Sequence, residues 1–237
     1  NRTTIELTKQ DDEWVITSPI TAPGNSSRIE LLLSLLSQPI SSQQTISPQT
    51  PLTKFGINDQ SSQLILNQHQ FTFGDTNTID QNRYILHNNT LYLINDNIHP
   101  LLNTSVTSFI DNQIIPQNEI IAELTLPIYQ TGTLSTQITT LTNQGDIWHN
   151  EFLDDNEKLK QIITNWQNAK ALQVLPAASL NDINWPDQPN FIAETDKQSL
   201  QFTMILNDTM LLLKNPQTNL VYQLPKQNSE QLLISNE

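Results

Sequence analysis

The sequence predicts an α+β protein made of two tandem related units, each a mainly antiparallel sheet with one principal helix packed on a face. The first observation is a repeat: the block Leu7–Trp14 recurs as Leu141–Trp148, with five of eight residues identical. A helical pattern follows each copy of the block, and short strand-like runs follow each helix. A chain that restarts in this way indicates an internal repeat. Short turns between the runs favour antiparallel pairing.

The repeated block is expected to be a strand, a turn and the start of a second strand. Asp11 and Asp12 lie in the predicted turn, and Trp14 begins the strand that follows. We expect Trp14 and its counterpart Trp148 to pack beneath the next helix, because a tryptophan buries a large apolar area. The alternative is an aromatic platform that stacks a ligand.

One amphipathic helix is expected after each block. Apolar residues at i, i+3, i+4 and i+7 mark one helix face, and this spacing occurs at 29–36 and again at 159–166. Ser27 and Asp154 are the predicted N-caps, each followed three residues later by a glutamate. The first helix is expected to end before Pro39, because the residue preceding a proline disfavours helical backbone.

A meander of about four strands is expected after each helix. The runs lie at 64–66, 71–73, 84–86 and 91–94 in the first copy and at 191–193, 200–205, 210–213 and 220–222 in the second. Corresponding features stay about 128 to 134 residues apart. We therefore predict a first unit at 1–115 and a second, diverged unit at 116–237, with Ile120–Leu126 as a strand that either unit can hold. The alternative is an accidental alignment of two ordinary α+β segments.

Composition excludes several classes of protein. The net charge is −13 and only eleven residues are Lys or Arg, so we predict no nucleic-acid partner, because phosphate binding needs clustered cations. The absence of cysteine excludes disulfides and thiolate metal sites. The longest apolar run, Ile29–Leu36, is too short to cross a bilayer, which takes about 20 residues. The sequence starts at Asn1 without a methionine, and we expect membrane contact only through a segment that precedes it.

Motifs for catalysis are absent from the sequence. The five glycines are too scattered for a phosphate-binding loop, and the four histidines form no zinc motif. We predict no catalytic residues, no cofactor and no metal. His69 and His87 flank neighbouring predicted strands and can meet in space. They are either surface histidines at turns or part of a hydrolase that uses one of them with a nearby carboxylate.

Several short motifs occur in a fixed order in the first copy. They are Trp14-Val15-Ile16 with Pro19, a leucine-rich helix at 28–36, Phe55-Gly56-Ile57, Phe73-Gly74-Asp75 and Leu91-Tyr92-Leu93-Ile94. In these motifs the first copy resembles the family known as domain of unknown function 4340. The second copy departs from the pattern, because the loop after Trp148 lacks the proline and the aromatic–glycine pair is missing.

The resemblance implies a bacterial envelope protein with an N-terminal membrane anchor and a periplasmic, extracytoplasmic body. Some relatives lie beside transporters of the ATP-binding cassette (ABC) class, including those linked to gliding motility. The family implies no catalytic residues.

We accordingly expect a non-enzymatic binding or scaffold protein with a protein partner in the cell envelope. This hypothesis predicts an exposed apolar patch or a free sheet edge. The alternative is a module that binds a glycan or peptide in a crevice between the two units. Three aromatic residues are the candidate ligand or partner contacts, namely Tyr84, Tyr92 and Trp185.

Overall fold

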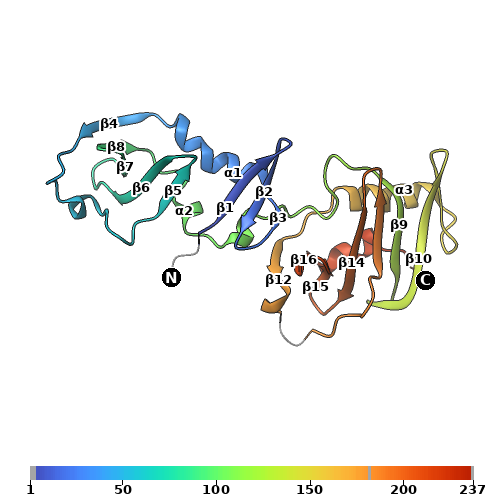
Figure 1. The fold of residues 1–237 in the computed structure, drawn as a ribbon. Coiled ribbons are helices and arrows are strands. Elements are labelled where there is room, and N and C mark those ends of the chain that lie inside the picture. The colour runs from blue at the N-terminus through green and yellow to red at the C-terminus, as the bar shows by residue number, and fades with distance from the viewer. Residues whose placement is uncertain (1–3, 181–182, 236–237) are drawn as a thin grey trace. The chain divides into compact units, whose positions relative to one another are not determined.

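The protein is a sheet-rich α+β chain in a computed structural model that describes residues 4–180 and 183–235 (Figure 1). Its contacts divide the chain into two compact units, each described by itself below. The small unit comprises 9–14 and 24–109, and the large unit comprises 1–8, 15–23 and 110–237. Whether 1–115 and 116–237 fold as independent domains stays a prediction.

The small unit carries a five-stranded antiparallel sheet in the order β4-β8-β7-β6-β5. Its elements are α1 (Ser26–Leu33), the 3-10 turn η1 (Ser34–Ser37), β4 (Ile40–Thr45), η2 (Leu52–Phe55), β5 (Gln63–Leu66), β6 (His69–Thr76), β7 (Arg83–His87), β8 (Thr90–Ile94), α2 (His99–Leu102) and η3 (Val106–Phe109). Asn67 and Asn88 have φ of 54° and 51° in the two-residue loops of hairpins β5–β6 and β7–β8. Such loops need left-handed backbone, which asparagine tolerates.

The large unit carries an eight-stranded antiparallel sheet in the order β11-β10-β9-β13-β14-β15-β16-β12. Its elements are β9 (Ile121–Gln130), β10 (Thr133–Gln144), β11 (Ile147–His149), α3 (Asn156–Gln167), β12 (Gln173–Pro176), η4 (Ala177–Ser179), β13 (Phe191–Thr195), β14 (Ser199–Leu206), β15 (Met210–Lys214), β16 (Leu220–Pro225), η5 (Lys226–Asn228) and α4 (Ser229–Leu232). The run expected at Ile120–Leu126 is part of β9, which pairs with β10 and β13 inside this unit.

Both copies of the repeated block form a hairpin. The first joins β1 (Glu6–Gln10) to β2 (Glu13–Ser18), which lie in a three-stranded sheet with β3 (Ala22–Pro23). Asp11 and Asp12 have φ of 47° and 69° in the first turn, and Gly145 and Asp146 have φ of 60° and 70° in the turn between β10 and β11. A pair of left-handed residues is the signature of a tight hairpin turn.

α3 follows the expected periodicity, whereas α1 ends at Leu33, and Leu36, the last residue of its predicted apolar face, is exposed in η1. The caps of both helices also differ from the prediction. Asn25, rather than Ser27, is the N-cap of α1, and Asp155, rather than Asp154, caps α3. Each side chain accepts a hydrogen bond from the backbone N–H three residues later, which a cap with extended backbone can reach. Ser27 lies inside the helix, where its backbone cannot adopt that geometry.

The core of the large unit lies between α3 and its sheet. Trp166 of α3 is fully buried, and its ring lies 4.5 Å from that of Phe191 on β13. Its indole Nε1–H donates to the carbonyl of Leu232 in α4 at 2.6 Å. α3 therefore connects the sheet to α4 through one side chain.

The two sheets share one connectivity. In each, the strand that follows the helix returns to pair with the last strand of the meander, giving β4-β8-β7-β6-β5 and β12-β16-β15-β14-β13. The pairing registers correspond too. One row of partners across the first sheet and its counterpart across the second are offset by 128 to 131 residues, namely Phe73, Ile85, Tyr92 and Gln43 against Met204, Leu213, Tyr222 and Val174.

Candidate functional site

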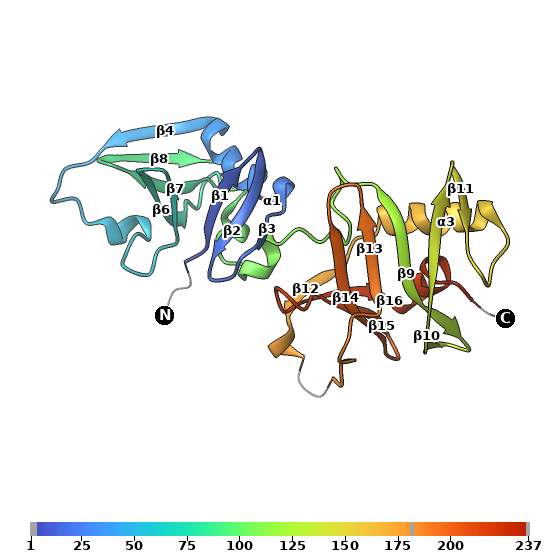
Figure 2. The ribbon, with the colours of Figure 1, turned by 45° about the vertical axis from the view of Figure 1, so that its right-hand side comes forward.

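Strand β4 forms an exposed edge of the five-stranded sheet. It pairs with β8 on one side only, and both views show it as the outermost strand of this sheet (Figures 1 and 2). All six of its side chains are exposed. An edge strand of this kind presents unpaired backbone groups that can accept a further strand.

The register identifies which backbone groups of β4 point away from the sheet. The N–H of Ile46 donates to the carbonyl of Asn89 at 2.9 Å, so these two residues form a hydrogen-bonded pair. Residues opposite each other in an antiparallel ladder alternate between bonded and non-bonded pairs. Gln43 and Thr45, opposite Tyr92 and Thr90, are therefore non-bonded and direct their N–H and C=O groups outward.

The corresponding edge of the large unit is protected. There the N–H of Ala177 donates to Asn219, which leaves Val174 and Pro176 of β12 as the outward residues. Val174 is only 3 % exposed, and Pro176 has no N–H to offer. These positions are the register equivalents of Gln43 and Thr45. Proline and burial are devices that blunt an edge against further pairing.

The opposite edge of the large sheet is also covered. The N–H of Trp148 in β11 donates to the side chain of Asn156 at 2.8 Å. Trp148 is opposite Asn143 as a non-bonded partner, so this is the outward donor of β11. The start of α3 thus satisfies the group that an added strand would use.

Strand β5 is the other edge of the small unit. By the same alternation its outward residues are Gln63 and Ile65, and Ile65 is 61 % exposed. β5 has four residues against six in β4, and Asp59 lies close before it in sequence. It is the natural comparison for any experiment on β4.

The segment that contains β4 carries no charge. No Asp, Glu, Lys, Arg or His occurs between Glu30 and Lys54, in a chain of net charge −13. Leu36 and Ile40, which precede and begin β4, are 65 % and 54 % exposed. The combination is a neutral strand with an apolar approach, and charged residues are what natural edge strands commonly use to prevent pairing.

A largely buried ion pair holds the sheet that carries β4. Arg83 of β7 contacts Asp96 at 2.6 Å and also donates to the carbonyl of Gly74 in β6, while Asp96 accepts from the N–H of His99 at 3.0 Å. Burial lowers the pKa of His99 and the guanidinium of Arg83 lowers it further, whereas the carboxylate of Asp96 raises it. A methyl group on Gly74 would lie 2.1 Å from the carbonyl of Phe55, so only glycine fits there. This network supports the sheet.

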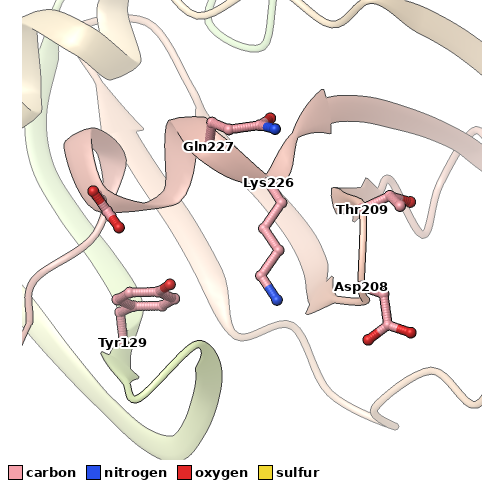
Figure 3. Close-up of a pocket in the computed structure, with 6 residues that line it drawn as sticks. Tyr129, Asp208, Thr209, Lys226 and Gln227 are labelled. Atoms are coloured by element: carbon pink, nitrogen blue, oxygen red, sulfur yellow. The ribbon is translucent and has the colours of Figure 1, made fainter.

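An open recess lined by polar side chains lies in the large unit (Figure 3). Lys226 extends between Tyr129 and Asp208, and the remaining lining residues are Thr209, Gln227 and Glu230. Its walls combine one cation, two carboxylates and neutral polar groups. Such a recess offers hydrogen bonds to a small polar molecule.

The three predicted contact residues do not share one surface. Tyr84 is opposite Leu93 and Tyr92 is opposite Ile85 on neighbouring strands, so the two tyrosines point to opposite faces of the sheet. Tyr84 packs against the ring of Phe55 at 5.0 Å and both tyrosines are half-buried. Trp185 belongs to the large unit, where Lys214 lies 5.7 Å from its ring. Their role as ligand or partner contacts stays a prediction.

The two histidines flanking neighbouring strands do meet. The rings of His69 and His87 lie 5.3 Å apart. Among the described residues no group of three or more His, Asp or Glu is placed to hold a metal ion. No helix in the described part of the chain is long and apolar enough to cross a membrane.

Sequence reasoning missed the strand that forms this site. β4 and its counterpart β12 were not among the predicted runs, because Ser-Ser-Gln-Gln-Thr shows no apolar alternation. The only signal in the sequence is an absence of charge: residues 31–53 are uncharged in an acidic chain, and Pro39 and Pro48 flank β4 within this stretch.

Comparison with known proteins gives one family and no individual relative. The family model named Domain of unknown function (DUF4340) matches residues 14–189, so the chain belongs to this family. The match extends past the first copy of the repeat and through α3 and β12 of the second. No curated protein and no solved structure matched the chain.

Proposed function

We propose that this member of the DUF4340 family is a non-enzymatic binding or scaffold protein that holds a protein partner at strand β4. The observation that carries the proposal is the contrast between edges: β12 and β11 are blocked, whereas β4 is fully exposed and neutral. A polar edge left open where its counterpart is closed has the form of a strand-addition site.

The partner contributes an extended segment that pairs with the outward groups of Gln43 and Thr45. Main-chain hydrogen bonds supply the affinity, and side chains flanking the strand supply specificity. Because 31–53 is uncharged, the segment is neutral or carries its charges outside the paired residues. Exposed Leu36 and Ile40 favour an apolar residue at one end of it. Binding should therefore change little with salt, since screening acts on charge pairs.

The test is site-specific crosslinking in the native host. A photoreactive residue at Gln43 should capture a protein partner, and the same residue at Gln63 of β5 should not. Thr45→Pro copies the residue of β12 onto β4 and removes one outward N–H while sparing the bonds to β8. Loss of the crosslink in Thr45→Pro, with the fold retained, is expected. Equal capture at Gln43 and Gln63, or unchanged capture in Thr45→Pro, contradicts the proposal.

The proposed location is the extracytoplasmic side of a bacterial inner membrane, reached through an N-terminal anchor outside this sequence. The proposed complex is an envelope assembly with an ABC-type transporter, or one of the gliding type. The family resemblance supports both statements. If the full-length protein in its host co-purifies with nothing and leaves the membrane at low salt, this part of the proposal fails.

We also infer that the two halves of the chain, 1–115 and 116–237, descend from one duplicated α+β unit. The support is the recurring block with its left-handed turn, the common strand order and the matching registers. An experimental structure in which β4–β8 and β12–β16 superpose only in another register would contradict the duplication.

A further inference from the structure

We propose that His69 and His87 form a binding site for one divalent transition-metal ion on the small unit. The two rings lie on the same face of the sheet. His87 is opposite Phe71 in the β6–β7 register, and His69 precedes Phe71 by two residues, which returns its side chain to that face. The proposal is independent of the partner site at β4.

The spacing of the rings fits one shared ion. The ring centroids are 5.3 Å apart and the rings are inclined by 57°. With metal–nitrogen bonds of about 2.0–2.1 Å, two imidazoles on adjacent positions of one ion have centroids about 4.5–5.3 Å apart. His69 is exposed, which leaves room for its ring to turn towards a shared ion.

His87 is held in the form that a metal needs. Its Nδ1 lies 3.0 Å from the carbonyl of Gln70, which can only accept, so Nδ1 is the donor; in the neutral ring the electron pair then lies on Nε2. A backbone carbonyl bound to the second ring nitrogen is the usual support of a metal-ligating histidine. Phe71 stacks on the ring at 4.6 Å and 20°, which fixes its plane.

One side chain competes for the ligand nitrogen. The amide Nδ2 of Asn88 lies 3.3 Å from Nε2 of His87, a long contact from an exposed turn residue. Metal binding displaces this amide. Asn88 has φ of 51°, so Asn88→Gly keeps the turn while removing the competitor.

The ion belongs to the imidazole-preferring class. Zn²⁺, Ni²⁺ and Cu²⁺ accept neutral imidazole, whereas Mg²⁺ and Ca²⁺ prefer oxygen. With two protein ligands the remaining positions are open to water or to a group from elsewhere. The expected affinity order is Cu²⁺ above Ni²⁺ and Zn²⁺.

The experiment titrates the whole chain with Cu²⁺ alone, and separately with Zn²⁺, while following the ring resonances of the four histidines. One equivalent of Cu²⁺ should broaden His69 and His87 first. His69→Ala and His87→Phe, which keeps a ring against Phe71, should each weaken binding at least about tenfold. Asn88→Gly should bind as tightly or more tightly, and His149→Ala, an exposed histidine of the large unit, should bind unchanged.

Two results overturn the site. One is equal broadening of all four histidines, which means an adventitious ion only. The other is unchanged affinity in His69→Ala, whose exposed position makes misfolding an inadequate explanation.

Discussion

The five-stranded sheet and the β12–β16 part of the eight-stranded sheet have the same connectivity but different surroundings. In the large unit Leu211, Leu212 and Leu213 are all buried, so β15 is covered on both faces. The equivalent strand β7 buries only Ile85 fully. The large sheet also continues through β9, β10 and β11, whereas the small sheet ends at β5. The same strand order is thus combined with apolar burial on both faces of β15 in the large unit, and with less apolar burial plus a polar network in the small unit.

The two sheets also differ in the exposure of their edge strands, and this difference bears on function. Val174 in the second sheet is buried and Gln43 in the first is exposed, although both face a tyrosine in the neighbouring strand. Pro176 stands where the first sheet has Thr45. An open edge is a hazard that proteins usually suppress. Its retention on one of two equivalent strands is the reason to assign a partner to it.

The comparison predicts its largest stability effect at Trp166. Trp166→Ala removes a fully buried indole, its contact with Phe191 and the hydrogen bond to Leu232. We expect a loss of about 3–5 kcal/mol, confined to the large unit. Urea unfolding gives the total, and hydrogen exchange of each unit locates it.

The control for Trp166 is another tryptophan of the same unit. Trp185 is only half-buried, and Trp185→Ala should cost far less. Equal losses at the two positions, or faster exchange in β4–β8 than in β9–β16, would show that apolar burial does not distinguish the sheets as described.

The second effect is expected at the polar network of the small unit. The side chains of Arg83 and Asp96 are 13 % and 14 % exposed. Arg83→Met leaves the largely buried carboxylate of Asp96 without its cation, which should cost about 2–4 kcal/mol. Hydrogen exchange should accelerate in β6, β7 and β8 and stay unchanged in the large unit.

Two further variants test whether the loss of stability comes from breaking this ion pair or from removing a charged residue anywhere. Lys160→Met breaks the pair with Glu157, which is largely exposed, and should change stability little. The double variant Arg83→Met with Asp96→Leu should recover part of the loss, because no unpaired charge remains. If the double variant is as unstable as Arg83→Met, the loss of stability comes from packing and not from the unpaired charge.

Local patterns in the sequence anticipated most of the regular elements. The spacing at 159–166 predicted a helix whose Leu159, Ile162 and Trp166 are buried, and the meander strands formed near their predicted positions. The α+β class and the antiparallel sheets are confirmed. These features rest on local periodicity, which a single sequence displays.

Features that depend on distant partners were not predictable in the same way. β4 and β12 become strands because they pair with β8 and β16, about 44 to 54 residues further along the chain, and neither has an alternating pattern of its own. The opposite orientation of Tyr84 and Tyr92 depends on a register that only the pairing sets. Which edge is open likewise depends on what covers each strand.

The smallest effect concerns two tyrosines at equivalent register positions, Tyr222 in β16 and Tyr92 in β8. Burial raises the pKa of Tyr222 to about 12, and the carboxylate of Asp111 acts in the same direction. The unfolded chain loses this proton near pH 10, so the contribution to stability is complete below pH 10 and is lost as pH rises towards 12. By pH 11 the loss should be about 1.4 kcal/mol.

Tyr222→Phe should remove this part of the alkaline destabilisation. The measurement is the free energy of unfolding of the large unit between pH 9 and pH 11, about one unit either side of an ordinary tyrosine pKa. Tyr92→Phe provides the matched control, and a change in the pH profile of the large unit there, or none in Tyr222→Phe, would mean that burial of the β16 tyrosine does not set the alkaline limit.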